Sequence, residues 1–435
     1  MALRAAAGEA ELSPAPGQWM TGFALRDLPA EGTHDPILAR ALLLDDGAGR
    51  LAIVVCDLLG LAPESVARIR GAVAAAGALP GERVLVACTH THSGPACMPM
   101  RGALGHVDEG WLQQAEGRIA GLVTALAERL EPAQLAWGRM QVKGIGYNRQ
   151  DEAHPIDTEL LALAAERPGG ESIATLLSYA THAVVLGPEN RLFSGDWPGA
   201  AARALAQLRG GVGLCLQGTC GDVDPVVNRD RGWGSGRFRD AEQIGARLAK
   251  AGAQALERAA RRTDVQLQAA SRTVAVPLDP PPALDALAIF SAQWHERRVQ
   301  TIGRKAAEME AEAMLAWAAE LRQALAEERV PATLAAEVWA ARIGEVRLVG
   351  LPFEPYSDIG LAIKQALAPA PVLVVGYANG LYGYCPTNWA KDQGGYGADS
   401  SYRWFSALLT AVGYGAAEAL VEAAVSLLRE RLPTD

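Results

Sequence analysis

The sequence predicts an α/β fold in which a layered, mixed β-sheet core is flanked by helices. Three observations lead to this prediction. Short β-rich runs alternate with amphipathic helical stretches through the first half of the chain. A later run alternates polar and apolar residues, as an antiparallel strand does. Half of the 435 residues are apolar, which is enough for a large core.

Within the first half, each strand-like run is followed by a helical pattern. The strand-like runs are residues 51–58, 83–89, 172–181 and 211–218, and the helical patterns are residues 63–77, 110–130, 197–209 and 239–261. Residues 265–278 alternate, and the proline-rich residues 279–282 then interrupt the chain. Further strands are expected within 335–352 and 371–379, and an Ala-rich helix over 401–431. No internal sequence repeat is visible.

Residues 283–328 predict a helical insertion, because Ala, Glu and Arg recur there with helical spacing. The segment is long enough for a helical hairpin. It is either a solvated excursion or a lid or oligomer contact. Candidate chemical residues are spread from position 34 to position 396, so we expect residues 1–435 to form a single domain around this insertion.

Composition excludes several classes of function. The net charge is −9 and no run of Lys or Arg stands out, so nucleic acid is not an expected partner. The six cysteines lie in apolar stretches without a CxxC pair, which predicts buried free thiols in a reducing compartment. The N-terminus has no apolar secretory core, and the apolar stretch 407–428 carries Glu418 and Glu422. We therefore expect a cytoplasmic protein without a transmembrane segment.

Histidines follow two of the predicted strands. The motif 89-THTHSGP comes directly after the run 83–88, and an extended backbone would turn His90 and His92 to one face. His182 ends the run 172–181 in the same way. Neutral imidazole is the commonest zinc ligand, so these residues are candidate ligands. The alternative is that they are ordinary polar residues at strand ends.

Carboxylates and tyrosines end the later strands. Asp222 and Asp224 lie in the Gly-rich turn after residue 218, either as turn formers or as carboxylates for proton transfer. Glu354 stands at a strand-to-helix turn, where the helix dipole alone can favour it. A Gly-rich loop that either covers the surface or lines a site carries four tyrosines: Tyr377, Tyr382, Tyr384 and Tyr396.

Taken in this order, the motifs resemble the neutral/alkaline non-lysosomal ceramidase family, specifically its N-terminal catalytic domain. The likeness is strongest at 89-THTHSGP and spans most of the chain, with 283–328 as its weakest part. The other segments that carry it are 13-SPAPGQWMTGFALR, 33-THDPILARALLL, 51-LAIVVCDLLG, 148-NR, 194-SGDWPG, 221-GDVDP, 352-PFE and 376-GYANGLYGY.

This resemblance implies a set of site residues. The zinc ligands of the family fall on His90, His182, Glu354 and Tyr384. Its substrate-polarising groups fall on His92, Arg149 and Tyr396. Asp196, together with Asp222, is expected behind the ligands, where such residues orient them.

Two departures from the family pattern change the expected chemistry. The nucleophilic serine of the family falls on Asp224 here. The chain also ends without the C-terminal immunoglobulin-like domain, and begins without the secretion signal, of that family. We therefore expect a cytosolic relative that keeps the metal site and has altered the attacking group.

The sequence accordingly predicts a zinc-dependent hydrolase that cleaves a linear amide of an N-acylated small molecule or lipid. Metal-activated water would attack, with Asp224 as the base. Three alternatives remain: an esterase or lactonase, an amide-forming or cyclising acyl transfer enzyme on the same site, and a metal-retaining binding protein without turnover. An oligomer is possible.

Overall fold

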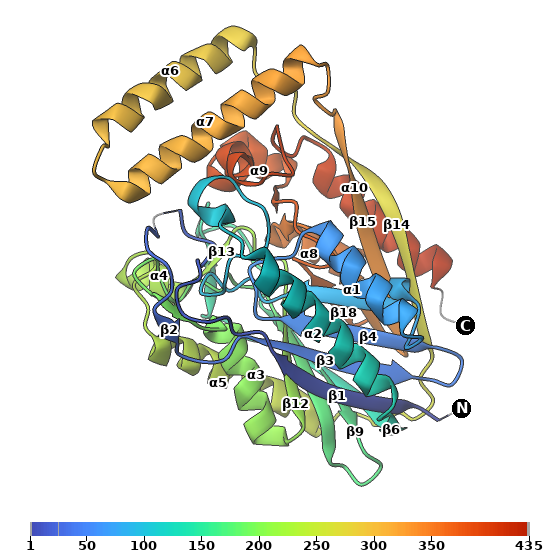
Figure 1. Ribbon diagram of the computed structural model, residues 1–435. Helices are drawn as coiled ribbons and strands as arrows, with labels where there is room; N and C mark the ends of the chain where they lie inside the picture. The colour runs from blue at the N-terminus through green and yellow to red at the C-terminus, as the bar shows by residue number, and fades with distance from the viewer. Residues whose placement is uncertain (1, 25, 433–435) are drawn as a thin grey trace.

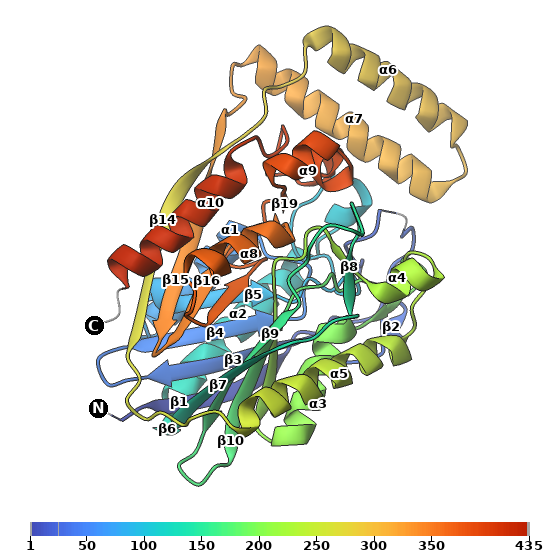
Figure 2. The same ribbon diagram turned by 180° about the vertical axis from the view of Figure 1, so that it is seen from behind.

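The computed structural model describes residues 2–24 and 26–432. Within these residues, three larger sheets share one strand pattern: antiparallel strands come first, and a helical crossover then leads to a parallel edge strand. The prediction of a layered, mixed α/β fold is confirmed. Figures 1 and 2 show the sheets from opposite sides, with helices on their outer faces.

The first unit has the strand order β5-β4-β3-β1-β6. Strands β4 and β5 run parallel, and the other neighbours are antiparallel. Its elements are β1 (Arg4–Glu11), β3 (Leu38–Asp45), β4 (Arg50–Cys56), α1 (Pro63–Ala75), β5 (Val84–Cys88), α2 (Glu109–Ala127) and β6 (Glu131–Pro132).

The second unit has the order β12-β10-β9-β7, with β10 and β12 parallel. Its elements are β7 (Gln134–Gln141), β9 (Glu159–Glu166), β10 (Ser172–Tyr179), α3 (Asp196–Arg209), β12 (Val212–Gln217) and α5 (Phe238–Glu257).

The third unit has the order β14-β15-β16-β18, with β16 and β18 parallel. Its elements are β14 (Leu267–Pro277), β15 (Thr333–Ile343), β16 (Val346–Gly350), α8 (Ser357–Ala366), β18 (Val372–Val375) and α10 (Ala416–Ser426). The same architecture thus occurs three times, although no internal repeat is visible in the sequence.

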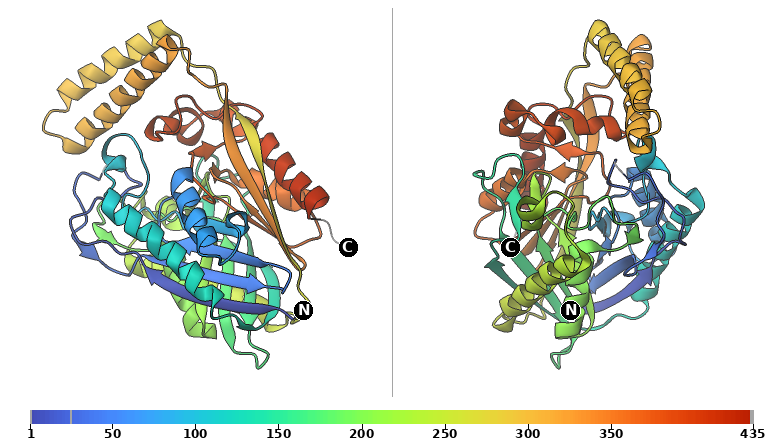
Figure 3. Two further views of the ribbon diagram at one scale, coloured as in Figure 1. Left: turned by 45° about the vertical axis from the view of Figure 1, so that its right-hand side comes forward. Right: turned by 90° about the vertical axis from the view of Figure 1, so that its left-hand side faces the viewer.

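The insertion between β14 and β15 is a helical hairpin. It consists of α6 (Leu284–Gln300) and α7 (Lys305–Ala326). Figure 3 shows the hairpin projecting from one end of the molecule. Trp317 and Leu321 of α7 are fully buried and hold the hairpin on the body of the protein.

Short strand pairs and helices lie beside the sheet ends. The pairs are β2 (Gly32–Thr33) with β11 (Leu192–Phe193), β8 (Gly146–Asn148) with β13 (Val223–Pro225), and β17 (Glu354–Pro355) with β19 (Tyr384–Cys385). The short helices are α4 (Val226–Arg231) and α9 (Asn388–Gln393).

The inner faces of the three sheets meet in one central core. It contains Ile53 and Leu85 from the first sheet, Leu163 from the second, and Trp339 and Leu348 from the third, all fully buried. Separate apolar clusters lie under the outer helices of each unit. Because a sheet that is buried on both faces needs apolar residues at successive positions, these strands are nearly continuous in apolar residues.

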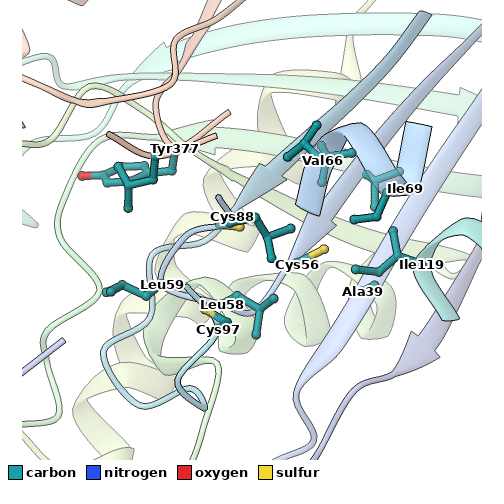
Figure 4. Packing of buried hydrophobic residues seen from close by; sticks show 14 of the residues in the cluster. Ala39, Cys56, Leu58, Leu59, Val66, Ile69, Cys88, Cys97, Ile119 and Tyr377 are labelled. Carbon is teal, nitrogen blue, oxygen red and sulfur yellow. The ribbon is translucent and has the colours of Figure 1, made fainter. Parts of the chain in front are cut away.

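All six cysteines are buried and free, as the sequence predicted. In the first unit, Cys56, Cys88 and Cys97 pack near Val66 and Ile69 of α1 (Figure 4). Among the described residues, no helix combines the length and the apolar composition that crossing a bilayer requires.

Two sequence predictions differ from the structure. Strands β1, β3, β7 and β9 were not predicted. The sequences of β1, β3 and β9 are rich in Ala and Leu and contain no β-branched or aromatic residue, and β7 has only Trp137 of these types. The helix expected over 401–431 begins only at Ala416. Before it, Val412 pairs with Leu278, and Gly415 adopts a φ of 82°, which an L-residue rarely adopts.

A buried ion pair at the end of β4 gives a test of this architecture. Arg40 Nη1 lies 2.7 Å from Asp57 Oδ2, and the two residues are 2% and 0% exposed. We predict that Arg40→Met destabilises the protein by about 3–5 kcal/mol, because it leaves a buried carboxylate without its partner. Urea denaturation would measure the loss. The double variant Arg40→Met/Asp57→Asn should recover most of it, and a single variant as stable as the parent would contradict the prediction.

Candidate metal centre

Polar side chains from all three units meet at the carboxyl ends of the parallel strand pairs. His90 and His92 follow β5, and His182 follows β10. Glu354 and Tyr384 lie beyond β16 and β18. Backbone bonds join these ends: the amide of Cys88 donates to the carbonyl of Tyr377 at 3.1 Å, and that of Gly376 to Gln217 at 3.2 Å. The fold therefore brings distant segments to one place.

Two imidazoles are oriented by backbone carbonyls. Nδ1 of His90 lies 2.7 Å from the carbonyl oxygen of Leu59, and Nδ1 of His182 lies 2.6 Å from that of Cys220. A carbonyl only accepts, so each Nδ1 carries the proton and each Nε2 keeps its lone pair. Both Nε2 atoms face Glu354 Oε2, at 3.1 Å and 3.2 Å.

Glu354 and Tyr384 are placed opposite each other by the pairing of β17 with β19. The Tyr384 hydroxyl lies 3.4 Å from His182 Nε2, and both residues are buried. The four ligands that the family resemblance implied therefore converge on one position.

His92 approaches the same position from the other side of His90. Its Nε2 lies 3.1 Å from His90 Nε2, and His90, His92 and His182 form a group that can hold a metal ion. The extended backbone expected for the motif was wrong: β5 ends at Cys88 and His90 has a φ of 60°. The two imidazoles meet through this left-handed residue.

The charges in this cluster call for a cation. Burial lowers the pKa of His92 well below its usual value, and it also lowers that of His182. Imidazole lone pairs and a carboxylate oxygen repel one another at these distances unless a positive charge lies between them.

The donor spacing fits zinc. Zinc–nitrogen bonds of about 2.0–2.1 Å in a tetrahedral site separate neighbouring donors by about 3.3–3.4 Å. The separations of Glu354 Oε2 and Tyr384 Oη from the histidine Nε2 atoms are 3.1–3.4 Å. His90, His182, Glu354 and Tyr384 can thus hold the ion.

Backbone strain concentrates around this cluster. Five described residues other than glycine have a positive φ, between 51° and 60°. Four of them are His90, Asp196, Tyr377 and Asn379, and the fifth is Glu328. The Tyr377 ring stacks on the His90 imidazole with ring centres 4.0 Å apart. Such conformations persist only where the surrounding structure fixes them, which is typical of functional sites.

Arg149 connects the cluster to Asp224. Its Nη2 donates to the Tyr384 hydroxyl at 3.0 Å and to the carbonyl of Gly221 at 2.7 Å. Its Nη1 donates to Asp224 Oδ1 at 3.3 Å. Asp224 is buried, lies in β13, and pairs with Tyr147 of β8. The structure therefore places Arg149 and Asp224 next to the candidate ligands.

Asp222 and Asp196 hold backbone segments rather than imidazoles. Asp222 accepts hydrogen bonds from the amide and hydroxyl of Ser357 and from the Asn148 side chain, at 2.7–2.8 Å. Asp196 accepts from the amides of Leu186 at 3.0 Å and Trp197 at 2.6 Å. Both support the loops that carry His182 and Glu354. They were expected to contact the ligand side chains directly, and they contact the neighbouring backbone instead.

Tyr396 lies at the outer edge of the site. It is 54% exposed, and its ring packs edge-on against that of Tyr384 with centres 5.8 Å apart. Of the residues predicted for substrate polarisation, His92 and Arg149 touch the cluster directly, and Tyr396 reaches it only through Tyr384.

Sequence reasoning missed the groups that orient the histidines. The carbonyls of Leu59 and Cys220 belong to residues that have no polar side chain to attract notice. Gly22 and Phe23 pack against the His92 ring, and a Cβ on Gly22 would lie 2.6 Å from it. The positive φ of 103° at Gly22 gives a second reason for glycine there.

Comparison with known proteins agrees with the fold. A model of the family "neutral/alkaline non-lysosomal ceramidase, N-terminal" matches residues 12–218. Neutral ceramidase of Pseudomonas aeruginosa is 25% identical over 256 residues, covering 52% of this chain and 38% of the length of that relative. The chain therefore matches less than half of that protein.

Solved structures resemble the whole chain. The crystal structure of neutral ceramidase from Pseudomonas aeruginosa superposes with a TM-score of 0.75 at 21% identity, covering 100% of this chain and 76% of that one. A ceramidase complexed with C2 gives a TM-score of 0.75 at 20% identity, with the same coverage. These likenesses show that the fold is shared.

Metal analysis would test the ligand set. We predict about one zinc ion per chain. His90→Ala and His182→Ala should each lose it, because both candidate ligand sets include these two histidines and either variant lacks one ligand of each set. His295→Ala on the exposed face of α6 is the matched control and should keep the metal. His92→Ala separates the two possible sets: retention supports the set with Glu354 and Tyr384, and loss supports the three-histidine set. Full retention in both His90→Ala and His182→Ala would contradict the site.

Proposed function

We propose that the chain is a zinc-dependent hydrolase related to the neutral/alkaline non-lysosomal ceramidases, whose N-terminal family model matches residues 12–218. Its substrate would be a linear amide of an N-acylated small molecule or lipid. The observation that carries the proposal is the convergence of His90, His182, Glu354 and Tyr384 beside the pair Arg149–Asp224.

A zinc ion held by these four residues would supply Lewis-acid polarisation of the amide carbonyl and lower the pKa of a coordinated water to about 7. The protein itself supplies the rest. The carbonyls of Leu59 and Cys220 keep the His90 and His182 lone pairs aimed inward. Preorganised ligands of this kind avoid rearrangement during the reaction.

Asp224 is the group that we propose as the general base. Arg149 holds its carboxylate at 3.3 Å, and the same guanidinium contacts Tyr384, which keeps the carboxylate close to the metal ligands. In this role Asp224 takes a proton from the attacking water and returns it to the departing amine. A carboxylate in place of the serine nucleophile of the family suits attack by water.

His92, Arg149 and Tyr396 are proposed as donors to the oxygen that becomes negative during attack. His92 borders the cluster through His90, and Arg149 through Tyr384. Tyr396 is the exposed member, so we expect it to act once substrate covers it. One donor of this kind is typically worth about 3 kcal/mol.

The helical hairpin is proposed as a wall of the substrate entrance. Arg101 donates to the carbonyls of Arg403, Phe405 and Leu408 and pairs with Glu320 of α7 at 2.6 Å. The Phe405 ring lies 6.4 Å from that of Tyr384. The hairpin thus contacts the loop that borders the cluster.

Asp224→Asn tests the mechanism. We predict that this variant keeps the zinc and the fold but loses about a hundred- to ten-thousand-fold in rate, the usual contribution of a general base. Single turnover in oxygen-18 water should label the product acid and leave the protein unlabelled. Label in the Asp224 carboxylate would show an acyl-aspartate instead. Unchanged activity in Asp224→Asn would contradict the role of Asp224 as general base and leave it with a structural role in the turn.

A shortened hairpin tests the entrance wall. Replacing its tip, residues 297–308, with a Gly-rich turn leaves Trp317 and Leu321 in place, so the body of the protein should stay folded. We predict a change in preference among N-acyl chain lengths, with zinc content unchanged. Rates on a series of chain lengths, beside metal analysis, would measure both. Proportional loss on all chain lengths would contradict the wall.

A further inference from the structure

Arg26 is a buried arginine without a counter-ion. It is 3% exposed, and no ion pair in the described part of the chain includes it. Its Nη1 donates to the carbonyls of Thr21 at 3.2 Å and His92 at 3.1 Å. Its Nε and Nη2 have no hydrogen-bond partner. By contrast, buried Arg40 and Arg101 each pair with a carboxylate.

This arrangement is costly unless something else binds there. A buried, unpaired charge loses its hydration without compensation, and each buried donor without a partner adds to the cost. The guanidinium is the cation that stays protonated near neutral pH, so it cannot escape the cost by losing its proton. The arrangement therefore indicates that an acceptor from outside the chain completes it.

A second group nearby lacks a partner too. His92 Nδ1 is buried and unpaired. Phe23 links the two residues, because its ring centre lies 4.9 Å from the His92 ring and 5.1 Å from the Arg26 guanidinium carbon. Two adjacent side chains thus each have a buried nitrogen without a hydrogen-bond partner.

The outer boundary of this region is aromatic. Trp233 is 50% exposed and packs edge-on against Phe23 with ring centres 5.1 Å apart. On the inner side, Arg26 holds the backbone of His92, whose ring touches the metal cluster. A ligand group at Arg26 would therefore belong to the same molecule that reaches the metal.

We propose that Arg26 is a substrate-binding residue that takes a carboxylate, so that the amide substrate is an N-acyl amino acid. This inference rests on the proposed function. The free Nε and Nη2 form the planar, two-pronged edge of the guanidinium, which matches a carboxylate bidentately. One unpaired positive charge calls for one negative charge, which a carboxylate supplies. Neutral amides would leave Arg26 unpaired and bind more weakly.

The test compares amides that differ in charge, using the zinc-loaded protein. The acids are N-dodecanoylglycine and N-dodecanoyl-β-alanine, and the neutral partner is N-dodecanoylethanolamine. For the parent protein we expect the KM of at least one of the two acids to be about 10- to 100-fold lower than the KM of the neutral ethanolamide. This is the usual effect of a charged hydrogen-bonded pair. Arg26→Met should lose this preference, and Arg26→Lys should keep part of it. Arg258→Met, on the exposed end of α5, is the matched control.

Calorimetry separates this inference from the proposed function. If none of the amides is hydrolysed, the hydrolase proposal fails, but binding of N-dodecanoylglycine still reports on Arg26. Tighter binding of the acid than of the ethanolamide by the parent protein, lost in Arg26→Met, would support the carboxylate site. Equal binding of both compounds by the parent protein would overturn it, and that measurement needs no variant. Inorganic phosphate that binds there in preference to the acids would overturn the assignment to a carboxylate.

Discussion

The site depends on one electrostatic constraint: two imidazole nitrogens, each with its proton bound elsewhere on the ring, lie 3.1 Å and 3.2 Å from the same carboxylate oxygen. The carbonyls of Leu59 and Cys220 take those protons, so the inner surfaces of His90, His182 and Glu354 are purely electron-donating. A cation relieves this repulsion, and the left-handed backbone at His90 and Tyr377 is tolerated because the same arrangement requires it.

The architecture explains how residues so far apart in sequence reach this arrangement. Each unit ends a parallel strand pair at the same edge of the molecule, and backbone bonds join β5 to β18 and β18 to β12 there. The first unit delivers His90, the second His182, and the third Glu354 with Tyr384. The apolar core between the sheets fixes the relative positions of these strand ends, so packing far from the metal centre determines the distances within it.

The sequence predicted much of this because strand ends are visible in it. Apolar runs that stop at His90, His182 and Glu354 signal both a strand and a site, and the family resemblance added Tyr384 and Arg149. It did not predict β1, β3 and β9, because Ala and Leu suit a buried strand and a helix equally well. Nor did it predict the roles of Leu59 and Cys220, since a backbone carbonyl leaves no trace in residue type. Arg26 lay in a quoted motif, but its missing partner is visible only in three dimensions.

The threefold repetition of the architecture has a consequence for how the protein matures. Contacts within a unit are local in the chain and can form as that unit emerges, whereas the metal centre draws one edge from every unit. The first two units together supply only His90 and His182, so the set of four candidate ligands is complete only when the third unit adds Glu354 and Tyr384. Binding of the proposed metal ion by the full ligand set would therefore require the third unit to be docked, which couples metal affinity to completion of the fold.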